Sequence, residues 1–450
     1  MNFEQLSSEL AQTIQQFHLP ACGVGISSHG QTFTQGYGTY DPDWVFPIAS
    51  ISKSFLATTI CRLADAKILD LDQPIQQAWS DFQMFDEHAT KSLTWRDLLS
   101  HRSGLPAHDL MRFTNGPLTL AQVAQKVRYL KPNVDVRYRM QYNNLMFGVL
   151  TYALEQVLGT DYYTYLQENL LDLLQLKHTY VHDERSLAPI APPYFRFTQG
   201  RKKITFMSPG HLGGASSMLS MPEDLLAWSQ FHLYNYQKHD ANNLAQMYKP
   251  QVVMTPSRPF AKPQFSAYGF GMMMETYRGY KYFYHSGSFI GYCAMLGFVP
   301  DLDLSFVMLT NMDSTNATFA VPYQIIDAAA GLDKVDWSQK IRYIERQNKA
   351  QQKAKEQAQF GDTKFEVASH SRWLGTYQHP GYGTIELRDY KGQLVAKFGT
   401  MTCAVVQDLK GKLFIDAPLL HQLIALKINN RNLQLLAEPA LGTMTTFEKI

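Results

Sequence analysis

The chain has 450 residues, 45% of them hydrophobic and 18% charged, and its formal net charge is +2. This length exceeds one ordinary hydrophobic core, so two or three globular domains are expected. The sequence contains no dense basic block and no acidic tail, which argues against nucleic acid as a partner. Its four cysteines lie far apart and form neither a disulfide framework nor a metal-binding CxxC pattern.

The first twenty residues predict an amphipathic helix, because apolar side chains recur at helical spacing from Phe3 to Phe17. The segment lacks the basic start and the apolar core of a signal peptide. No run of about 18 apolar residues occurs anywhere, so no membrane span is expected. We therefore favour a cytoplasmic location, and a periplasmic one stays open if a leader has been removed.

Residues 21–40 predict a β-hairpin with its turn near Gly30, and a helix is expected to begin close to Ser50. Residues 56–245 are predicted to be mostly helical. The segment 267–311 has the pattern of successive strands separated by Gly and Pro-Asp. Strands from both ends of this region, with helices inserted between them, predict a layered helix-and-sheet arrangement without a regular βαβ repeat.

Residues 338–360 are dominated by Gln, Lys and Glu without Gly or Pro, which predicts a polar surface helix. The last ninety residues contain short alternating stretches punctuated by Gly, typical of a small antiparallel sandwich or barrel. We expect three parts: a first domain over 1–335, a polar helical linker over 336–362 and a β-domain over 363–450.

The stretch "FPIASISKSF" contains a serine, Ser50, three residues before a lysine, Lys53. On a helix these two side chains share one face. A serine hydroxyl becomes a nucleophile when a base removes its proton, and a lysine with a lowered pKa can be that base. The spacing alone favours a simpler interpretation, in which Ser50 caps the helix and Lys53 is solvated.

Two further polar clusters are candidates. Tyr142 and Asn144 stand at the start of a buried helix, where the phenol can relay a proton and the amide can orient a lysine. The alternative is helix capping. His285 begins a His-Ser-Gly-Ser stretch between strands, and Gly287 would let a ligand backbone approach the strand edge. Here the alternative is a hairpin turn with a solvent-exposed histidine.

Together, Ser-x-x-Lys, Tyr-x-Asn and His-Ser-Gly in this order resemble the serine β-lactamase and penicillin-binding protein superfamily. The class C β-lactamases and the related esterases and D-amino-acid peptidases are the most similar members. Segments such as "LTWRDLLSHRSGLP" and "GHLGGASSMLSMPEDLLAW" extend the resemblance over roughly residues 15–330. It implies an α+β fold: a β-lactamase-like α/β/α sandwich around an antiparallel sheet, with an inserted helical subdomain.

The resemblance also implies roles. Ser50 would be the acylated nucleophile, and Lys53 and Tyr142 would share the acid and base work. The backbone N–H groups of Ser50 and Ser288 would form the oxyanion hole. Substrate contacts would come from Asn144, which would also contact Lys53, and from the third motif: His285, Ser286, Gly287 and Ser288.

This sequence departs from the family pattern at His285, where penicillin-binding enzymes commonly have lysine. A histidine is largely neutral at pH 7, so selection for a substrate carboxylate is less assured. A second departure, "LDLLQLKHT" in place of Pro-Leu-Gly-Met, is expected to be structural.

Other hydrolase signatures fit less well. His101 and Ser103 in "LLSHRSGLP" could be taken for a catalytic pair, but in the resembling family this segment is a structural turn shaped by Gly104 and Pro106. There is no G-x-S-x-G elbow of an α/β-hydrolase and no H-E-x-x-H zinc motif.

The C-terminal segment resembles the lipocalin-like β-domain appended to many such hydrolases. Trp373, Tyr377 and Tyr382 are expected to pack inside it. Such a domain would wall the active site or build an oligomer interface.

We therefore expect a serine hydrolase that uses an acyl-enzyme on small amides, esters or peptides, with D-residue peptides among the candidates. A true β-lactamase or D,D-carboxypeptidase is the alternative, and a non-catalytic peptide-binding or scaffolding homologue is a third. No cofactor and no metal is expected. The partner is a small-molecule or peptide substrate, and a homo-oligomer stays open.

Overall fold

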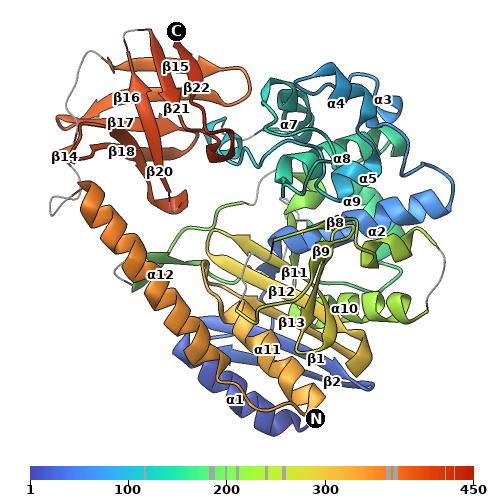
Figure 1. The fold of residues 1–450 in the computed structure, drawn as a ribbon. Coiled ribbons are helices and arrows are strands. Elements are labelled where there is room, and N and C mark those ends of the chain that lie inside the picture. Colours follow the sequence, from blue (N-terminus) through green and yellow to red (C-terminus); the bar gives the residue numbers. More distant parts are fainter. Residues whose placement is uncertain are drawn as a thin grey trace.

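A computed structural model describes residues 1–450 except 116–117, 182–187, 198–199, 209–211, 239–241, 256–259, 361–365, 368–372, 421 and 430. Its centre is an eight-stranded antiparallel sheet in the order β2-β1-β13-β12-β11-β10-β9-β8 (Figure 1). The strands are β1 (Ala21–Ser28), β2 (Gln31–Gly38), β8 (Val252–Val253), β9 (Ser266–Tyr268), β10 (Met273–Tyr277), β11 (Tyr280–Phe289), β12 (Tyr292–Val299) and β13 (Leu304–Thr310).

The predicted hairpin and the predicted joining of both chain regions in one sheet are confirmed. Strand β1 pairs with β2 on one side and with β13 on the other, where Cys22 lies opposite Thr310. Both β1 and β13 are buried along their whole length, as expected for strands covered on both faces.

Helices cover the two faces of this sheet. Helices α1 (Phe3–Gln16), α11 (Ala317–Ala330) and the start of α12 (Trp337–Phe360) pack on one face around a core that includes Leu10. Helices α2 (Ser52–Asp65) and α10 (Pro222–Gln237) cover the other face. This is the α/β/α sandwich that the resemblance implied.

A mainly helical region is inserted beyond α2 (Figure 1). It contains α3 (Ile75–Ala78), α4 (Glu87–Ser92), α5 (Trp95–Leu99), α6 (Met111–Thr114), α7 (Leu120–Lys126), α8 (Asn144–Leu158) and α9 (Tyr162–Leu166). The structure adds short strands that the sequence did not predict: β3 (Phe46–Pro47), β4 (Tyr180–Val181), β5 (Tyr194–Phe197), β6 (Gly200–Lys203) and β7 (Met218–Ser220).

The C-terminal strands form a closed eight-stranded barrel, because β18 pairs with both β17 and β19. Its strands are β15 (Gly375–His379), β16 (Gly383–Tyr390), β17 (Gln393–Phe398), β18 (Met401–Gln407), β19 (Leu413–Ala417), β20 (Gln422–Ile428), β21 (Asn432–Leu435) and β22 (Thr445–Lys449). A further short strand, β14 (Glu366–Val367), pairs with β18. Tyr377 and Tyr382 are buried as expected, and Trp373 is partly buried.

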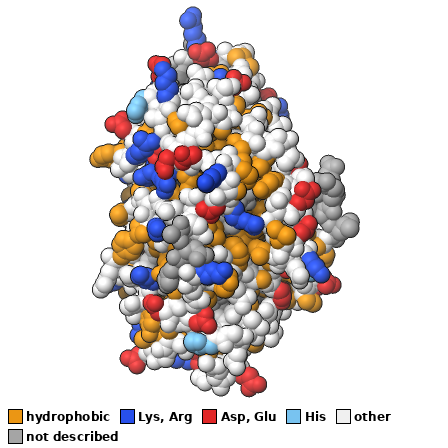
Figure 2. Space-filling view, turned by 90° about the vertical axis from the view of Figure 1, so that its right-hand side faces the viewer, with side chains coloured by type: hydrophobic (Ala, Val, Ile, Leu, Met, Phe, Trp, Pro, Cys, Tyr) orange, Lys and Arg blue, Asp and Glu red, His pale blue; other side chains and the backbone are white. Residues whose placement is uncertain are grey.

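Helix α12 runs from the sandwich toward the barrel (Figure 1). Its first turns are anchored, since Trp337 and Ile341 are buried, whereas most of the later side chains are exposed. Among the described residues, no helix is both long and apolar enough to cross a lipid bilayer. On the face shown in Figure 2, cationic and anionic side chains are interspersed with hydrophobic ones.

Candidate active site

Ser50 lies in a single 3₁₀ turn, Ala49–Ile51, that leads directly into α2. Its neighbour Ala49 has a φ of +46°, a left-handed conformation that is uncommon for a residue with a side chain. Such strained backbone is found at functional sites, where the surrounding structure holds it in place. The turn places the partly buried Ser50 one helical turn ahead of Lys53.

The side chain of Lys53 is completely buried, and its Nζ lies within hydrogen-bond distance of three neutral oxygens. Nζ lies 2.9 Å from Ser50 Oγ, 2.7 Å from Asn144 Oδ1 and 2.8 Å from the Ala215 carbonyl oxygen. None of these acceptors carries a charge. Burial lowers the pKa of Lys53 well below its ordinary value, nearby Arg112 lowers it further, and Asp109 opposes the shift.

The ring of Tyr142 completes this group. Its centroid lies 4.8 Å from Lys53 Nζ, and its hydroxyl takes part in a hydrogen bond with Ser50. Burial raises the pKa of Tyr142, and the bond with Ser50 only partly opposes this. The phenol therefore keeps its proton at neutral pH, which suits a proton donor or relay more than a standing phenolate.

Two adjacent asparagines divide the tasks of capping and contact. Asn143 caps α8, since its Oδ1 accepts a hydrogen bond from the Met146 N–H. Asn144 is the first residue of the helix, and its side chain is directed toward Lys53. Asn144 Nδ2 donates to Asp109 Oδ1 over 3.3 Å. The capping alternative thus applies to Asn143 and not to Asn144.

The third motif lies on β11, and its histidine is fully buried. His285 Nδ1 lies 2.8 Å from the Ser286 carbonyl oxygen, which can only accept, so Nδ1 carries the proton. Nε2 then accepts from the Tyr268 hydroxyl, 3.1 Å away. Burial, followed by the charge of Lys53, lowers the pKa of His285 to about 3. The imidazole is therefore neutral, and both of its nitrogens are occupied.

Gly287 explains how β11 reaches the nucleophile. A Cβ atom at this position would lie 2.1 Å from the carbonyl oxygen of Ile48 and 3.3 Å from the Ala49 side chain. Only glycine permits this approach. It brings β11 against the turn that carries Ser50. Ser286 is half-buried next to it and Ser288 is exposed, so the end of the strand is open to a ligand.

His101 has a supporting place beside the site. It is buried, its Nδ1 accepts a hydrogen bond from the Asn143 N–H, and its ring centroid lies 4.3 Å from that of Tyr142. Ser103 Oγ accepts from the Leu105 N–H, as in a turn. This geometry agrees with the structural interpretation of "LLSHRSGLP". Burial lowers the pKa of His101 well below its ordinary value.

Several residues at the site have no counterpart in the sequence predictions. Ala215 contributes only a backbone carbonyl, for which no side-chain signal exists. Tyr268 stands on β9 and bonds His285. Asp109 lies just before α6, and Arg112 lies in its first turn. The two form an ion pair, with 3.7 Å between Asp109 Oδ1 and Arg112 Nη1. In the described part of the chain, no group of histidine, cysteine and acidic side chains could hold a metal ion.

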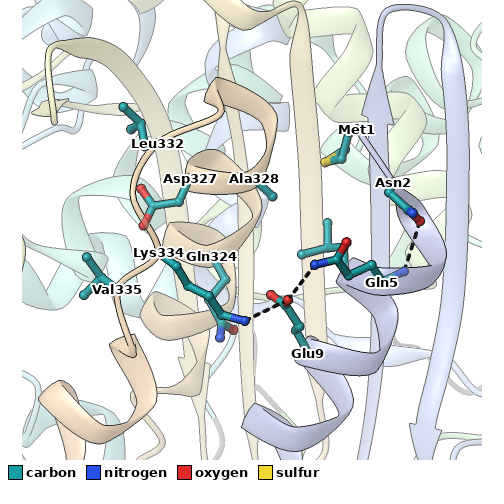
Figure 3. A pocket seen from close by; sticks show the side chains of 11 residues that line it. Met1, Asn2, Gln5, Glu9, Gln324, Asp327, Ala328, Leu332, Lys334 and Val335 are labelled. Carbon is teal, nitrogen blue, oxygen red and sulfur yellow. Dashed lines mark hydrogen bonds and ion pairs between the residues drawn. The ribbon is translucent and has the colours of Figure 1, made fainter.

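A separate pocket lies between α1 and the end of α11 (Figure 3). There Lys334 Nζ donates to Glu9 Oε1 over 2.8 Å, and Gln5 donates to the same oxygen. The lining contains none of the predicted site residues, so the pocket is not the candidate active site.

Comparisons with known proteins agree with this fold. The family model described as "Beta-lactamase" matches residues 6–331. The unguisins hydrolase ungD′ of Aspergillus campestris is 24% identical over 84% of this chain and 76% of its own length. The octameric penicillin-binding protein homologue from Pyrococcus abyssi has a TM-score of 0.64 at 18% identity, covering 100% of both chains. A D-stereospecific amidohydrolase from Streptomyces sp. has a TM-score of 0.63 at 20% identity, covering 73% of this chain and 98% of its own. The chain therefore belongs to the beta-lactamase family, and its relatives indicate a hydrolase.

Proposed function

We propose that the protein is a serine hydrolase in which Ser50 is acylated by small amides, esters or peptides. The observation that carries this proposal is the hydrogen bonding of Lys53. Asn144 Oδ1 and the Ala215 carbonyl oxygen are pure acceptors, and they take two N–H groups of the lysine. In a neutral amine the remaining position is a lone pair, and it faces Ser50 Oγ at 2.9 Å. The lowered pKa of Lys53 favours that neutral form.

The proton path follows from this geometry. As Ser50 Oγ attacks the substrate carbonyl carbon, its proton passes to Lys53 Nζ. Tyr142 gives its phenolic proton to the leaving nitrogen or oxygen and recovers one from the Lys53 ammonium. The acyl group stays on Ser50 until water attacks the ester, and its proton returns by the same groups in reverse. In each half-reaction Lys53 and Tyr142 end in their starting protonation states, and the enzyme returns to its free form when water has removed the acyl group.

The developing negative charge on the carbonyl oxygen needs hydrogen-bond donors in fixed positions. We assign this task to the backbone N–H groups of Ser50 and Ser288. The approach of Gly287 to within contact of Ile48 supports the assignment, because it brings the end of β11 against the Ser50 turn. Asn144, His285, Ser286 and Gly287 would line the bound substrate.

The substrate class follows from the neutral third motif. His285 offers no fixed positive charge to a carboxylate, so substrates without a carboxylate on the leaving side of the scissile bond are favoured over penicillins and peptides ending in D-Ala-D-Ala. The name of one similar protein, a D-stereospecific amidohydrolase, supports amide substrates that include D-residues, and the name of another, an unguisins hydrolase, supports hydrolysis. A homo-oligomer is proposed from the octameric homologue, and sedimentation velocity tests it.

A fluorophosphonate probe followed by peptide mapping tests the nucleophile. We expect one adduct on Ser50, absent in Ser50→Ala. A panel of p-nitrophenyl esters, D-aminoacyl amides and nitrocefin then tests the substrate class. An adduct that survives in Ser50→Ala contradicts the assignment of the nucleophile. Fast nitrocefin turnover without esterase or amidase activity identifies a true β-lactamase instead, and a wild-type protein without any adduct indicates a non-catalytic homologue.

A further inference from the structure

Two loops of the barrel contact the segment that leads to α8. In the β15–β16 loop, the Pro380 carbonyl oxygen accepts from Lys126 Nζ over 2.7 Å, and the Gly381 carbonyl oxygen accepts from Asn115 Nδ2 over 3.0 Å. Gly383 has a φ of +77°, and a Cβ there would lie 2.5 Å from Asn115 Oδ1. Buried apolar side chains continue without interruption from the helical region into the barrel.

His108 is the centre of this contact. It is 1% exposed and has a φ of +48°. Its Nε2 lies 2.9 Å from the Lys131 carbonyl oxygen and therefore carries a proton, so in the neutral ring Nδ1 accepts from the Tyr382 hydroxyl at 2.5 Å. The His108 backbone N–H donates to Glu438 Oε2 over 2.6 Å. Tyr382 and Glu438 both belong to the barrel and both are buried.

The next residue, Asp109, carries this contact into the candidate active site. Asp109 Oδ1 accepts from Asn144 Nδ2, and Asn144 Oδ1 accepts from Lys53 Nζ. The oxygen and nitrogen of a side-chain amide lie in one plane and point away from each other, on opposite sides of the Cβ–Cγ bond axis. An acceptor that holds the nitrogen therefore keeps the oxygen directed at Lys53, and a rotated amide would present N–H groups to Lys53 Nζ instead.

We propose that the barrel positions the Lys53–Asn144 pair: Tyr382 and Glu438 hold His108, and His108 holds Asp109 against the Asn144 amide. His108, Tyr382 and Glu438 are positioning residues, since they act through Asp109 and not on the substrate. This inference rests on the proposed function for its effect on catalysis. The barrel is then part of the acylating machinery.

The test removes one hydroxyl from each of two buried barrel tyrosines in the full-length protein. Tyr382→Phe loses the bond to His108. The matched control Tyr377→Phe loses a bond of similar length, 2.9 Å to the Trp373 carbonyl oxygen, that stays within the C-terminal part of the chain. We expect the rate of Ser50 acylation by a fluorophosphonate to fall about five- to tenfold in Tyr382→Phe and to stay within twofold of wild type in Tyr377→Phe. For a turned-over ester the loss should appear in kcat more than in KM.

A double-mutant cycle tests the route through Asp109. In an Asp109→Ala background, Tyr382→Phe should have almost no further effect, because the connection is already broken. Independent, multiplicative effects of the two substitutions overturn the proposal, and so does a Tyr382→Phe rate equal to wild type. Glu438→Gln provides a second, milder variant with the same expected direction.

Hydrogen–deuterium exchange of residues 108–115 separates this inference from the proposed function. We expect faster exchange there in Tyr382→Phe than in wild type or Tyr377→Phe. If the wild-type protein takes up no fluorophosphonate, the proposed function fails. Independently of that result, unchanged exchange in Tyr382→Phe overturns the inference that the barrel holds His108 and Asp109 in place.

Discussion

The hydroxyl of Tyr268 lies 3.1 Å from Nε2 of His285 and donates a hydrogen bond to that nitrogen. The other nitrogen is bound to the Ser286 carbonyl oxygen. Where penicillin-binding enzymes commonly have a charged lysine, this chain has a neutral histidine. Both of its nitrogens are hydrogen-bonded within the sheet. Recognition of a substrate carboxylate needs a donor, and this histidine has none to offer.

Selectivity for carboxylates should therefore be weak. With matched ester substrates that differ only by a carboxylate on the leaving part, we expect wild-type kcat/KM values to be equal or to favour the neutral ester. His285→Lys should raise the charged-to-neutral ratio about tenfold, whereas the neutral control His285→Gln should not. A wild-type enzyme that prefers the carboxylate substrate by tenfold or more would contradict this account.

The pH dependence of acylation should report Lys53. Because burial lowers the pKa of Lys53, the neutral base is available well below pH 10.5. The fluorophosphonate acylation rate should rise as pH increases through this lowered pKa and then level off. Lys53→Arg introduces a permanent charge that cannot release its proton, so we expect a loss of about 10³-fold at every pH. A rate that rises only near pH 10.5 would show that Lys53 is an ordinary solvated lysine.

Acid should destabilise the fold through its buried histidines. Nδ1 of His232 forms a hydrogen bond of 2.8 Å with the Tyr248 hydroxyl. Burial lowers the pKa of His232 from 6.5 to about 3. Between these two values the unfolded chain binds a proton that the folded chain does not, so stability falls as pH decreases from 6.5 to 3 and is fully regained above 6.5. In His232→Gln, urea unfolding at pH 4, 5 and 6 should show a slope smaller by about 1.4 kcal/mol per pH unit. An unchanged slope would mean that water reaches this site.

Gly287→Ala should separate β11 from the Ser50 turn. The new Cβ would meet the Ile48 carbonyl oxygen, which cannot rotate away as a side chain can. We expect a loss of about 1–3 kcal/mol in stability and at least a hundredfold slower acylation. Gly148→Ala on α8 is the matched control, since its Cβ would make an ordinary 3.4 Å contact with Val123. Equal acylation rates in both variants would remove Gly287 from the mechanism.

The sequence predicted those parts of the site that depend on short spacing. Local rules place Ser50 and Lys53 one helical turn apart and His285 between strands. Spacing alone favoured helix capping at Ser50, and only the resemblance to the family made these residues the preferred candidates. Contacts between distant parts of the chain could not be predicted in this way. The Ala215 carbonyl oxygen, the Tyr268 hydroxyl and the Asp109 carboxylate reach the site only through tertiary packing. The short strands β3–β7 span two to four residues, too few for an alternating pattern. The domain boundaries at 335 and 362 stay predictions.

The pairing of Cys22 with Thr310 has a consequence for the folding of the protein during its synthesis. During synthesis, Ser50 and Lys53 emerge from the ribosome long before β11 and β13. The nascent chain therefore contains the serine and the lysine without β11, the strand that packs against the Ser50 turn. Until residue 310 has emerged, β1 keeps an unpaired edge, which is a template for aggregation. We therefore expect a truncated chain that ends before residue 310 to aggregate or to be bound by chaperones, without partial activity. The candidate active site therefore cannot assemble before β11 and β13 have been made.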